Sequence, residues 1–139
     1  MDINVYGKLK DCLTEYFESL NLAKGHKPAI VEFEPSTPNY PIIKFTEVRN
    51  VPYEQYRGSR ETVANLGYRA DVYAKTYGKS SKSAIARESA KYCNDFLTMC
   101  KSLRLVSWNV VENDGANGEL YHIIMTYSVP YYEQRKKFL

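Results

Sequence analysis

The sequence predicts an α+β fold, in which two helices pack on one face of a mainly antiparallel or mixed β-sheet and a β-hairpin arm projects from the sheet. Apolar residues recur at helical spacing in residues 3–20 and 80–103, whereas the segments between and after them alternate apolar and polar residues. The order of helix, strands, helix and hairpin favours helices gathered on one face of an antiparallel sheet. Because the chain has 139 residues, we expect one domain spanning residues 1–139.

The first helix is expected from Ile3 to Leu20. Asp2 is suited to cap its N-terminus, because a carboxylate accepts hydrogen bonds from the unpaired amides of the first turn. Gly25 and Pro28 mark the end of the segment. The apolar stripe of this helix consists of Val5, Tyr6, Leu9, Cys12, Leu13, Tyr16, Phe17 and Leu20.

Two strands are expected next, at Ala29–Glu34 and Ile42–Arg49. The residues between them, Pro35–Pro41, include three prolines, which lack the amide donor that a sheet needs and therefore belong to a loop. The polar segment Asn50–Thr62 is longer than a tight hairpin requires. Since long connections between paired strands are often functional, we expect it to form the projecting arm.

The strand Val63–Tyr77 separates into two rows when every second residue is read. The first row is apolar and belongs in a core, and it contains Leu66, Tyr68, Ala70, Val72 and Ala74. The second row combines charge with an aromatic ring, and it contains Asn65, Arg69, Asp71, Tyr73 and Lys75. Such a row fits either a solvated sheet face or a contact surface between subunits.

The second helix is expected to run from a cap at Ser80 or Ser81 to about Leu103. Ala86 and Ala90 would allow this helix to lie close to the sheet. Its expected buried stripe consists of Ile85, Ser89, Tyr92, Cys93, Phe96, Met99, Cys100 and Leu103.

A final hairpin is expected from the strands Leu105–Val111 and Leu120–Val129. The turn Asn113–Gly118 joins them, because its residues tolerate positive φ, and Pro130 is expected to end the second strand. Val106, Trp108 and Val110 are expected on one face of the first strand. The core row of the second strand is expected to be Tyr121, Ile123, Met125, Tyr127 and Val129.

The overall composition excludes several classes of protein. The net charge of +3 is too weak to indicate nucleic-acid binding by itself. No apolar run is long enough to predict a membrane span or a signal peptide. Three scattered cysteines indicate reduced thiols, and we expect Cys12, Cys93 and Cys100 all to be buried on the helices.

One segment resembles a phosphate-binding loop in part. Gly78-Lys79-Ser80 follows a strand, opens a helix and matches the end of the P-loop motif. However, Tyr73 stands where the first glycine of that motif should be, and its side chain would obstruct a loop that wraps phosphates with bare amides. A turn with serine caps is favoured, so no nucleotide cofactor is expected.

Neither a metal centre nor a catalytic centre is predicted. His26 and His122 lie far apart, whereas a zinc site needs several close ligands. Glu32 and Glu34 alternate on one strand and could form an acid–base pair, although a solvated sheet face explains them more simply. Because no nucleophile stands beside an oriented base, we expect no catalytic residue, no cofactor and no enzymatic activity.

The polar row and the arm together form the candidate subunit interface. The chain contains 13 tyrosines, and tyrosine and arginine are enriched in the energetically dominant parts of interfaces. The candidate residues are Arg49, Tyr53, Tyr56, Arg57, Arg60, Arg69, Asp71 and Tyr73.

Three segments carry a resemblance to a known family: Tyr40–Lys75, Ser83–Cys100 and Leu103–Ser128. Their layout of strand, polar arm, a strand beginning Asn65-Leu66-Gly67-Tyr68, helix and hairpin resembles the small tail-terminator or tail-to-head joining proteins of long-tailed bacteriophages and prophages. Members of that family are also labelled minor capsid or tail-completion proteins. The resemblance rests on the order of elements and involves no catalytic signature.

This resemblance implies a structural virion protein, made in the host cytoplasm and located at the head–tail junction. It implies self-association into a ring, expected to be a hexamer, that caps the tail tube, ends tube polymerisation and joins the tail to the head. The implied partners are the tail tube protein and head–tail connector proteins, with DNA passing through the lumen without sequence-specific binding. The C-terminal tail, residues 130–139, could contact tail or connector through Arg135, Lys136 and Phe138.

Three alternatives remain open from the sequence. The chain could be another head–tail connector or head-completion protein. It could be a small nucleic-acid-binding module, with tyrosines stacking on bases and phosphates held by Lys79, Lys82, Lys91, Arg135, Lys136 and Lys137. It could also be a small hydrolase or nucleotide-binding enzyme that uses the turn Gly78-Lys79-Ser80.

Overall fold

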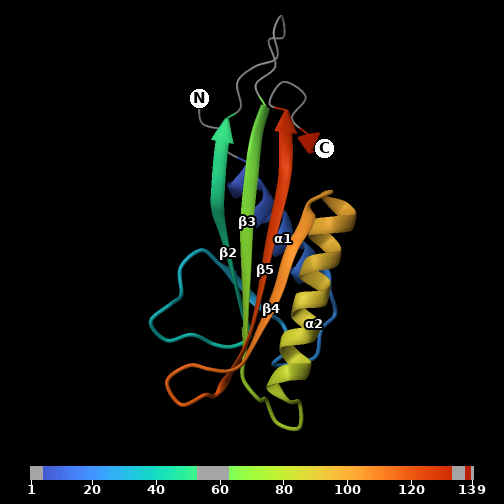
Figure 1. Ribbon diagram of the computed structural model, residues 1–139. Coiled ribbons are helices and arrows are strands. Elements are labelled where there is room, and N and C mark those ends of the chain that lie inside the picture. The colour runs from blue at the N-terminus through green and yellow to red at the C-terminus, as the bar shows by residue number, and fades with distance from the viewer. Residues whose placement is uncertain (1–4, 53–62, 133–136, 139) are drawn as a thin grey trace, which may run out of the picture.

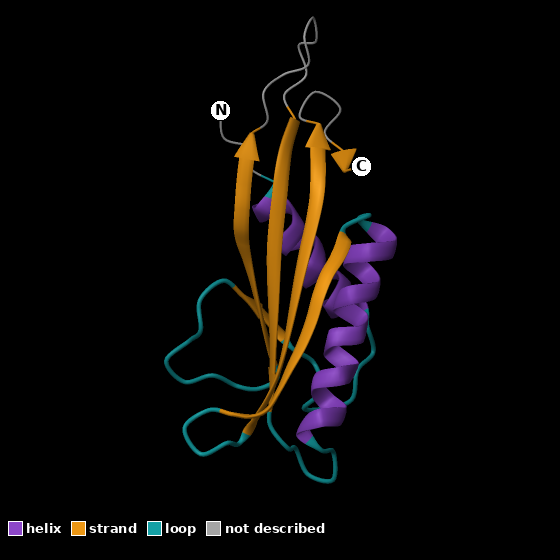
Figure 2. Ribbon diagram, in the orientation of Figure 1, coloured by secondary structure: helices purple, strands orange, loops and turns teal. Residues whose placement is uncertain are grey.

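The structure, a computed structural model, describes residues 5–52, 63–132 and 137–138. Two helices and six strands follow one another in it, and Figure 2 shows their arrangement. In chain order, the elements are α1 (Tyr6–Ser19), β1 (Ala29–Val31), β2 (Ile42–Pro52), β3 (Val63–Ala74), α2 (Lys82–Asp95), the π-helical turn η1 (Phe96–Cys100), β4 (Arg104–Asp114), β5 (Leu120–Tyr132) and β6 (Lys137–Phe138).

The strands form one mixed sheet in the order β1-β2-β3-β5-β4, with β6 paired to β5 (Figure 1). Only the short β1 runs parallel to its neighbour, and every other pair is antiparallel. The predicted α+β class and the mainly antiparallel sheet are therefore confirmed. Strand β1 is shorter than predicted, since it ends at Val31 rather than at Glu34.

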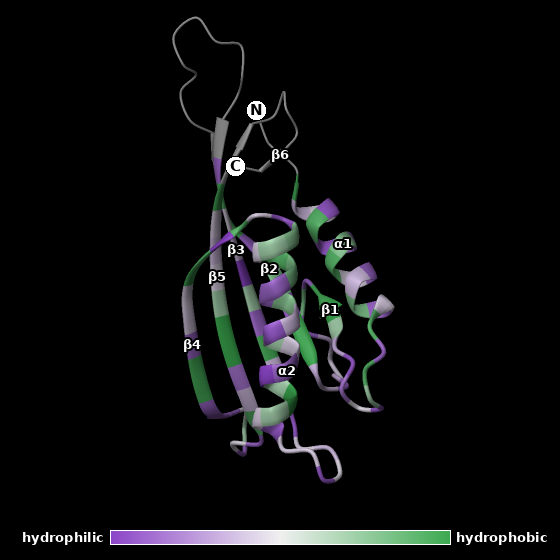
Figure 3. Cartoon of the chain, turned by 90° about the vertical axis from the view of Figure 1, so that its right-hand side faces the viewer, coloured by the Kyte–Doolittle hydropathy of each residue, from purple (hydrophilic) through white to green (hydrophobic). Residues whose placement is uncertain are grey.

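The core lies between the helices and one row of residues on the sheet. The apolar row of β3 is fully buried, as is most of the matching row of β5. Leu13 and Phe17 of α1 and Ile85 of α2 belong to the same buried cluster as these rows. In Figure 3 both helices lie to the right of β4 and β5, so the two strands present their other face away from them.

The segment of α2 and η1 shows where the predicted helical pattern is correct and where it is wrong. Ser81 caps α2 as predicted, because its side chain accepts a hydrogen bond from the Ala84 amide at 3.2 Å. The predicted stripe fails after Phe96: Leu97 is buried, whereas Met99 is 80% exposed and Cys100 is also exposed. The cause is η1, because a π-helical turn places its residues at a different angle from an α-helix.

The long strands exceed their predicted bounds at the same end of the sheet. Strand β2 continues through Asn50 to Pro52 and pairs there with β3, so these three residues belong to the sheet and not to the predicted arm. Residues 53–62, the rest of that arm, lie outside the described residues. Strand β5 also continues through Pro130, contrary to prediction. Pro130 pairs with Asn65 of β3 and lies between Ser128, where the pairing with β4 ends, and Tyr131, where the pairing with β6 begins. A residue without an amide donor is tolerated at such a gap in the pairing.

Candidate subunit interface

The sheet face opposite the helices, here called the open face, is built from three rows that cross the central strands. The register of the pairs β2–β3, β3–β5 and β4–β5 aligns them. From one end to the other, the rows are Thr46, Arg69, Thr126 and Ser107; Lys44, Asp71, Ile124 and Asn109; and Ile42, Tyr73, His122 and Val111.

A network of charged side chains lies across the open face. Arg69 Nε donates to both carboxylate oxygens of Asp71 at 3.0 Å. The two ring nitrogens of His122 lie 3.0 Å from Asp71 Oδ1 and 2.9 Å from Asp114 Oδ2. Asp71 and His122 are only 3% and 6% exposed. The network therefore joins β3 and β5 through a buried contact, and β4 through the part-exposed Asp114.

The geometry of this network lowers the pKa of Asp71. Carboxylate oxygens face both ring nitrogens of His122, so each nitrogen has a polar partner. Burial raises the pKa of Asp71, but hydrogen bonds from His122 and Arg69 outweigh burial and hold the pKa below its usual value. Because both of its ring nitrogens have carboxylate partners, His122 is arranged to hold the three strands together.

Tyr73 covers the histidine. Its ring is stacked on the His122 ring, with 4.1 Å between the ring centroids. Burial, helped by the nearby Asp71 carboxylate, raises the pKa of Tyr73 to about 12, so its hydroxyl stays protonated at neutral pH. Tyr73 and Arg69 are both half-buried and flank the buried pair on β3. The network thus fixes an aromatic ring and a guanidinium on the open face.

Two β-bulges frame a groove at the other end of the open face. The pairing register shifts between Glu47 and Arg49 on β2 and between Leu105 and Ser107 on β4. The extra residues, Val48 and Val106, are 57% and 56% exposed.

The groove between the bulges, here called the bulge groove, has a volume of about 560 Å³. Its lining residues are Val48, Arg49, Gly67, Arg104, Val106, Thr126, Tyr127 and Ser128. Both arginines are exposed. The groove therefore combines two apolar side chains with two positive charges.

The bulge on β4 corrects one sequence prediction. Val106, Trp108 and Val110 do not form one row, because the extra residue changes the alternation after Leu105. Trp108 and Val110 pair with Met125 and Ile123 on the side of the sheet that faces the core. Each is still 38% exposed, because β4 is an edge strand.

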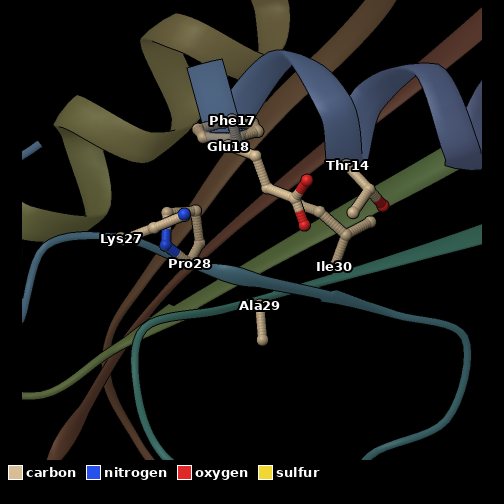
Figure 4. Close-up of a pocket in the computed structure, with 7 residues that line it drawn as sticks. All are labelled: Thr14, Phe17, Glu18, Lys27, Pro28, Ala29 and Ile30. Carbon is tan, nitrogen blue, oxygen red and sulfur yellow. The ribbon is translucent and has the colours of Figure 1, made fainter. Parts of the chain in front are cut away.

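A second hollow, of about 430 Å³, lies between α1 and β1 (Figure 4). Thr14, Phe17 and Glu18 line it from α1, and Lys27, Pro28, Ala29 and Ile30 line it from the other side. Phe17 and Pro28 are buried, whereas both charged side chains are exposed. The hollow thus resembles an ordinary surface depression beside a short strand more than a built binding site.

The turn that resembles a P-loop is closed on itself. Tyr77 and Ser80 exchange two backbone hydrogen bonds, of 3.0 and 2.9 Å, around Gly78 at a φ of +58°. The amide of Ser80 is therefore already paired within the turn. Lys82, one of the lysines considered for phosphate binding, donates instead to Asn113 Oδ1 and to the Gly118 carbonyl, each at 3.0 Å.

The histidine pair considered for metal binding is separated in space as well as in sequence. His26 contacts Glu88 at 3.2 Å and Ser80 at 2.9 Å, whereas His122 belongs to the open-face network. Over the described ranges, no group of three or more His, Cys, Asp and Glu side chains could hold a metal ion.

The structure brings together part of the predicted interface. Arg69, Asp71 and Tyr73 are neighbours on the open face, and Arg49 lines the bulge groove. Six predicted residues lie outside the described ranges: Tyr53, Tyr56, Arg57, Arg60, Arg135 and Lys136. The backbone of Phe138 belongs to β6 and pairs with Tyr131.

Sequence reasoning missed the partners of the predicted residues. The contact of His122 with Asp71 depends on the register between β3 and β5, because the two residues are 51 positions apart in the sequence. Val48 and Val106 were missed because single-strand alternation does not reveal a bulge. Gly67 was the available signal for the first bulge, since glycine inside a strand often marks a bulge or a close backbone approach.

The fold and the open face together define a small α+β protein whose sheet, over the described residues, is covered by helices on one side. A scan against protein-family models finds no matching family, and a search of curated proteins finds no match to the chain. Neither described helix has the length and apolar character needed to cross a membrane.

Proposed function

We propose that this chain is a structural subunit of a phage-type particle, which assembles into a ring that caps the tail tube, ends its polymerisation and joins the tail to the head. The open face is the proposed contact surface between neighbouring subunits. The observation that carries the proposal is that this face combines exposed apolar side chains at two bulges with a charge network whose central pair, Asp71 and His122, is buried although no described helix covers it.

A simple solvated face does not account for this combination. A water-facing row of an antiparallel sheet normally alternates polar side chains with the buried row. Here Val48 and Val106 present apolar surface beside Arg49 and Arg104, in the kind of mixture that marks protein contact surfaces. The open face is therefore better suited to binding another protein than to contact with water.

The charge network supports binding by holding its side chains in place before contact. Arg69 and Tyr73 are the half-buried members of the network, and their contacts with Asp71 and His122 restrict their conformations. Side chains ordered in advance lose less entropy on association, which increases affinity. The same argument favours a permanent structural contact over a transient one.

The element order supports assignment to a tail-terminator-like ring. In the described residues, β2, β3, α2 and the hairpin of β4 and β5 follow one another in the order on which the resemblance to tail-terminator and tail-to-head joining proteins rests. In a closed ring each subunit presents two different patches, because the interface is heterologous. The proposed mechanism is geometric: the ring binds the last layer of the tube, blocks further addition and offers its other side to the head.

Electron microscopy of tube polymerisation tests this proposal. Tail tube protein from the same particle would be polymerised with and without the purified chain. We expect rings at tube ends and shorter tubes when the chain is present. Tubes of unchanged length without rings at their ends would overturn the proposal. A chain that instead bound DNA with a steep dependence on salt would favour the nucleic-acid-binding alternative.

A further inference from the structure

An exposed aromatic residue between two acids follows β1. Phe33 is 78% exposed, and Glu32 and Glu34 on either side of it are exposed as well. A phenylalanine this exposed is unusual, because burying such a ring is one of the larger apolar gains available to a chain. In Figure 1 the connection between β1 and β2 extends away from the sheet beyond its β2 side. The segment Glu32–Glu34 is therefore placed to meet another molecule.

The bulge groove has the complementary character. Val48 and Val106 provide exposed apolar surface on its two sides, and Arg49 and Arg104 each add a guanidinium next to that surface. Gly67 and Ser128 line the groove between them with little side-chain bulk. An apolar ring flanked by two carboxylates matches this lining in both hydrophobicity and charge.

We propose that the segment Glu32–Glu34 of one subunit docks in the bulge groove of the next, with Phe33 between the two valines and the two glutamates paired with Arg49 and Arg104. This inference rests on the proposed function, because it names the two patches through which the ring closes. Tyrosine and arginine contacts on the remainder of the open face would then surround a central aromatic anchor, which is the usual anatomy of a protein interface.

The docking takes place between copies rather than within one chain. Phe33 is 78% exposed in the same structure in which Val48 and Val106 are exposed, so the chain does not fill its own groove. The segment and the groove are different surfaces of one chain, so each subunit donates one and receives one. Such a heterologous contact generates a ring if the rotation closes and a filament if it does not.

Site-specific photocrosslinking tests the contact directly. Benzoylphenylalanine would replace Phe33, and the chain would be irradiated after assembly on tail tubes. Mixing ¹⁵N-labelled and unlabelled chains separates crosslinks between copies from crosslinks within one copy. We expect crosslinks between copies that map to residues 48–49 or 104–107. Rings whose crosslinks map elsewhere, or that give none, would overturn this inference and leave the proposed function standing, whereas a failure to form rings would count against both.

Charge reversal provides a second, independent measurement. The double variant Glu32→Arg/Glu34→Arg and the double variant Arg49→Glu/Arg104→Glu should each fail to assemble alone, because each brings like charges together at every contact. A mixture of the two should assemble, since opposite charges meet at every contact of a ring in which the two variants alternate. A chain that carries all four changes should assemble by itself, because its own segment and groove again have opposite charges. Equal assembly of all variants would contradict the proposed pairing.

Truncation of the Phe33 side chain measures how much the ring contributes to the affinity between subunits. Phe33→Ala should raise the dissociation constant between subunits by roughly tenfold or more, as removal of a central aromatic side chain commonly does. Met99→Ala is the matched control, because Met99 is 80% exposed but lies on η1 rather than on either proposed patch. Both variants should keep the thermal stability of the parent chain, since both side chains are exposed. Equal effects of the two substitutions on assembly would contradict the inference.

Discussion

His122 is held between two carboxylates, and the nearer to the core belongs to Asp71, whose Oδ1 lies 3.0 Å from His122 Nε2. The two residues come from adjacent strands, β3 and β5, and both are almost fully buried on a face that no described helix covers. A buried carboxylate is costly unless it is paired and hydrogen-bonded. Asp71 meets that requirement through His122 on one side and Arg69 on the other. Replacing the Asp71 carboxylate, or protonating it, should therefore lower the stability of the fold.

The first prediction concerns Asp71 and acid. Because the pKa of Asp71 is lower in the folded chain than its ordinary value, its carboxylate contributes stability that is present above about pH 4 and is lost as the pH falls through the folded pKa. Asp71→Asn should lower the free energy of unfolding by about 2–3 kcal/mol at pH 7. Urea titrations should show this difference from the parent chain shrinking below about pH 4.

A control separates this effect from a general loss of charge. Asp11 is exposed on α1, so Asp11→Asn should change the free energy of unfolding by less than about 0.5 kcal/mol at either pH. The free energy of unfolding of Asp71→Asn would be compared with that of the parent chain from pH 7 to pH 3. If the difference stayed constant over this range, the Asp71 carboxylate would not be stabilised by its partners.

The second prediction concerns Gly67 and the bulge on β2. A Cβ atom added at Gly67 would lie 2.9 Å from Arg49 Cβ and 3.3 Å from Val48 Cγ2. Arg49 Cβ is attached directly to the backbone, so the bulge itself would have to shift. Gly67→Ala should therefore destabilise the chain by about 1–3 kcal/mol, measured from urea unfolding.

The same substitution at Gly7 should have the opposite effect on stability. Gly7 lies in the first turn of α1, and a Cβ added there would meet nothing within 4 Å. Gly7→Ala should stabilise the chain by up to about 1 kcal/mol, because alanine loses less backbone entropy in a helix. If both substitutions changed stability in the same direction, the close approach at Gly67 would not be what requires glycine.

The third prediction tests whether Val106 is used in assembly. Val106→Thr keeps the branched shape that suits a strand but replaces a methyl group with a hydroxyl. Because Val106 is 56% exposed, the melting temperature should change by no more than about 2 °C, whereas subunit association should weaken several-fold in sedimentation experiments. Val110→Thr is the control, since Val110 is exposed to 38% but lies on the opposite side of β4. Equal weakening by both variants would argue against a role for the bulge groove.

The sequence predicts the local parts of this fold well, because the signals are local. The two rows of β3 follow from strict alternation, and the cap at Ser81 follows from the chemistry of a serine before a helix. The α+β class follows from the order of these elements. Each of these inferences needs only residues within about one element of each other.

The parts that failed depend on relationships between distant strands or on departures from regular geometry. The pairing of Asp71 with His122 requires the register of β3 against β5, and Asp114 joins them only because β4 is irregular after Val111. The exposure of Val106 depends on one extra residue in β4. The sequence therefore predicts the candidate site only as a row of residues on one strand. The partners of these residues and the bulge groove depend on how the strands pair, and single strands do not reveal that.

The last prediction concerns the cysteines, where the π-helical turn changed the outcome. All three thiols were expected to be buried, but only Cys93 is fully buried, Cys12 is half-buried and Cys100 is exposed on η1. Burial raises the pKa of the Cys93 thiol to about 12, so almost none of it is in the reactive thiolate form at neutral pH. With N-ethylmaleimide, Cys100 should react within minutes and Cys93 only after unfolding in urea, as followed by peptide mass mapping. As a control, Cys100→Ser should abolish the fast phase of the reaction without changing the stability of the fold. Rapid modification of Cys93 in the folded chain would show that α2 and η1 do not hold this thiol in the core.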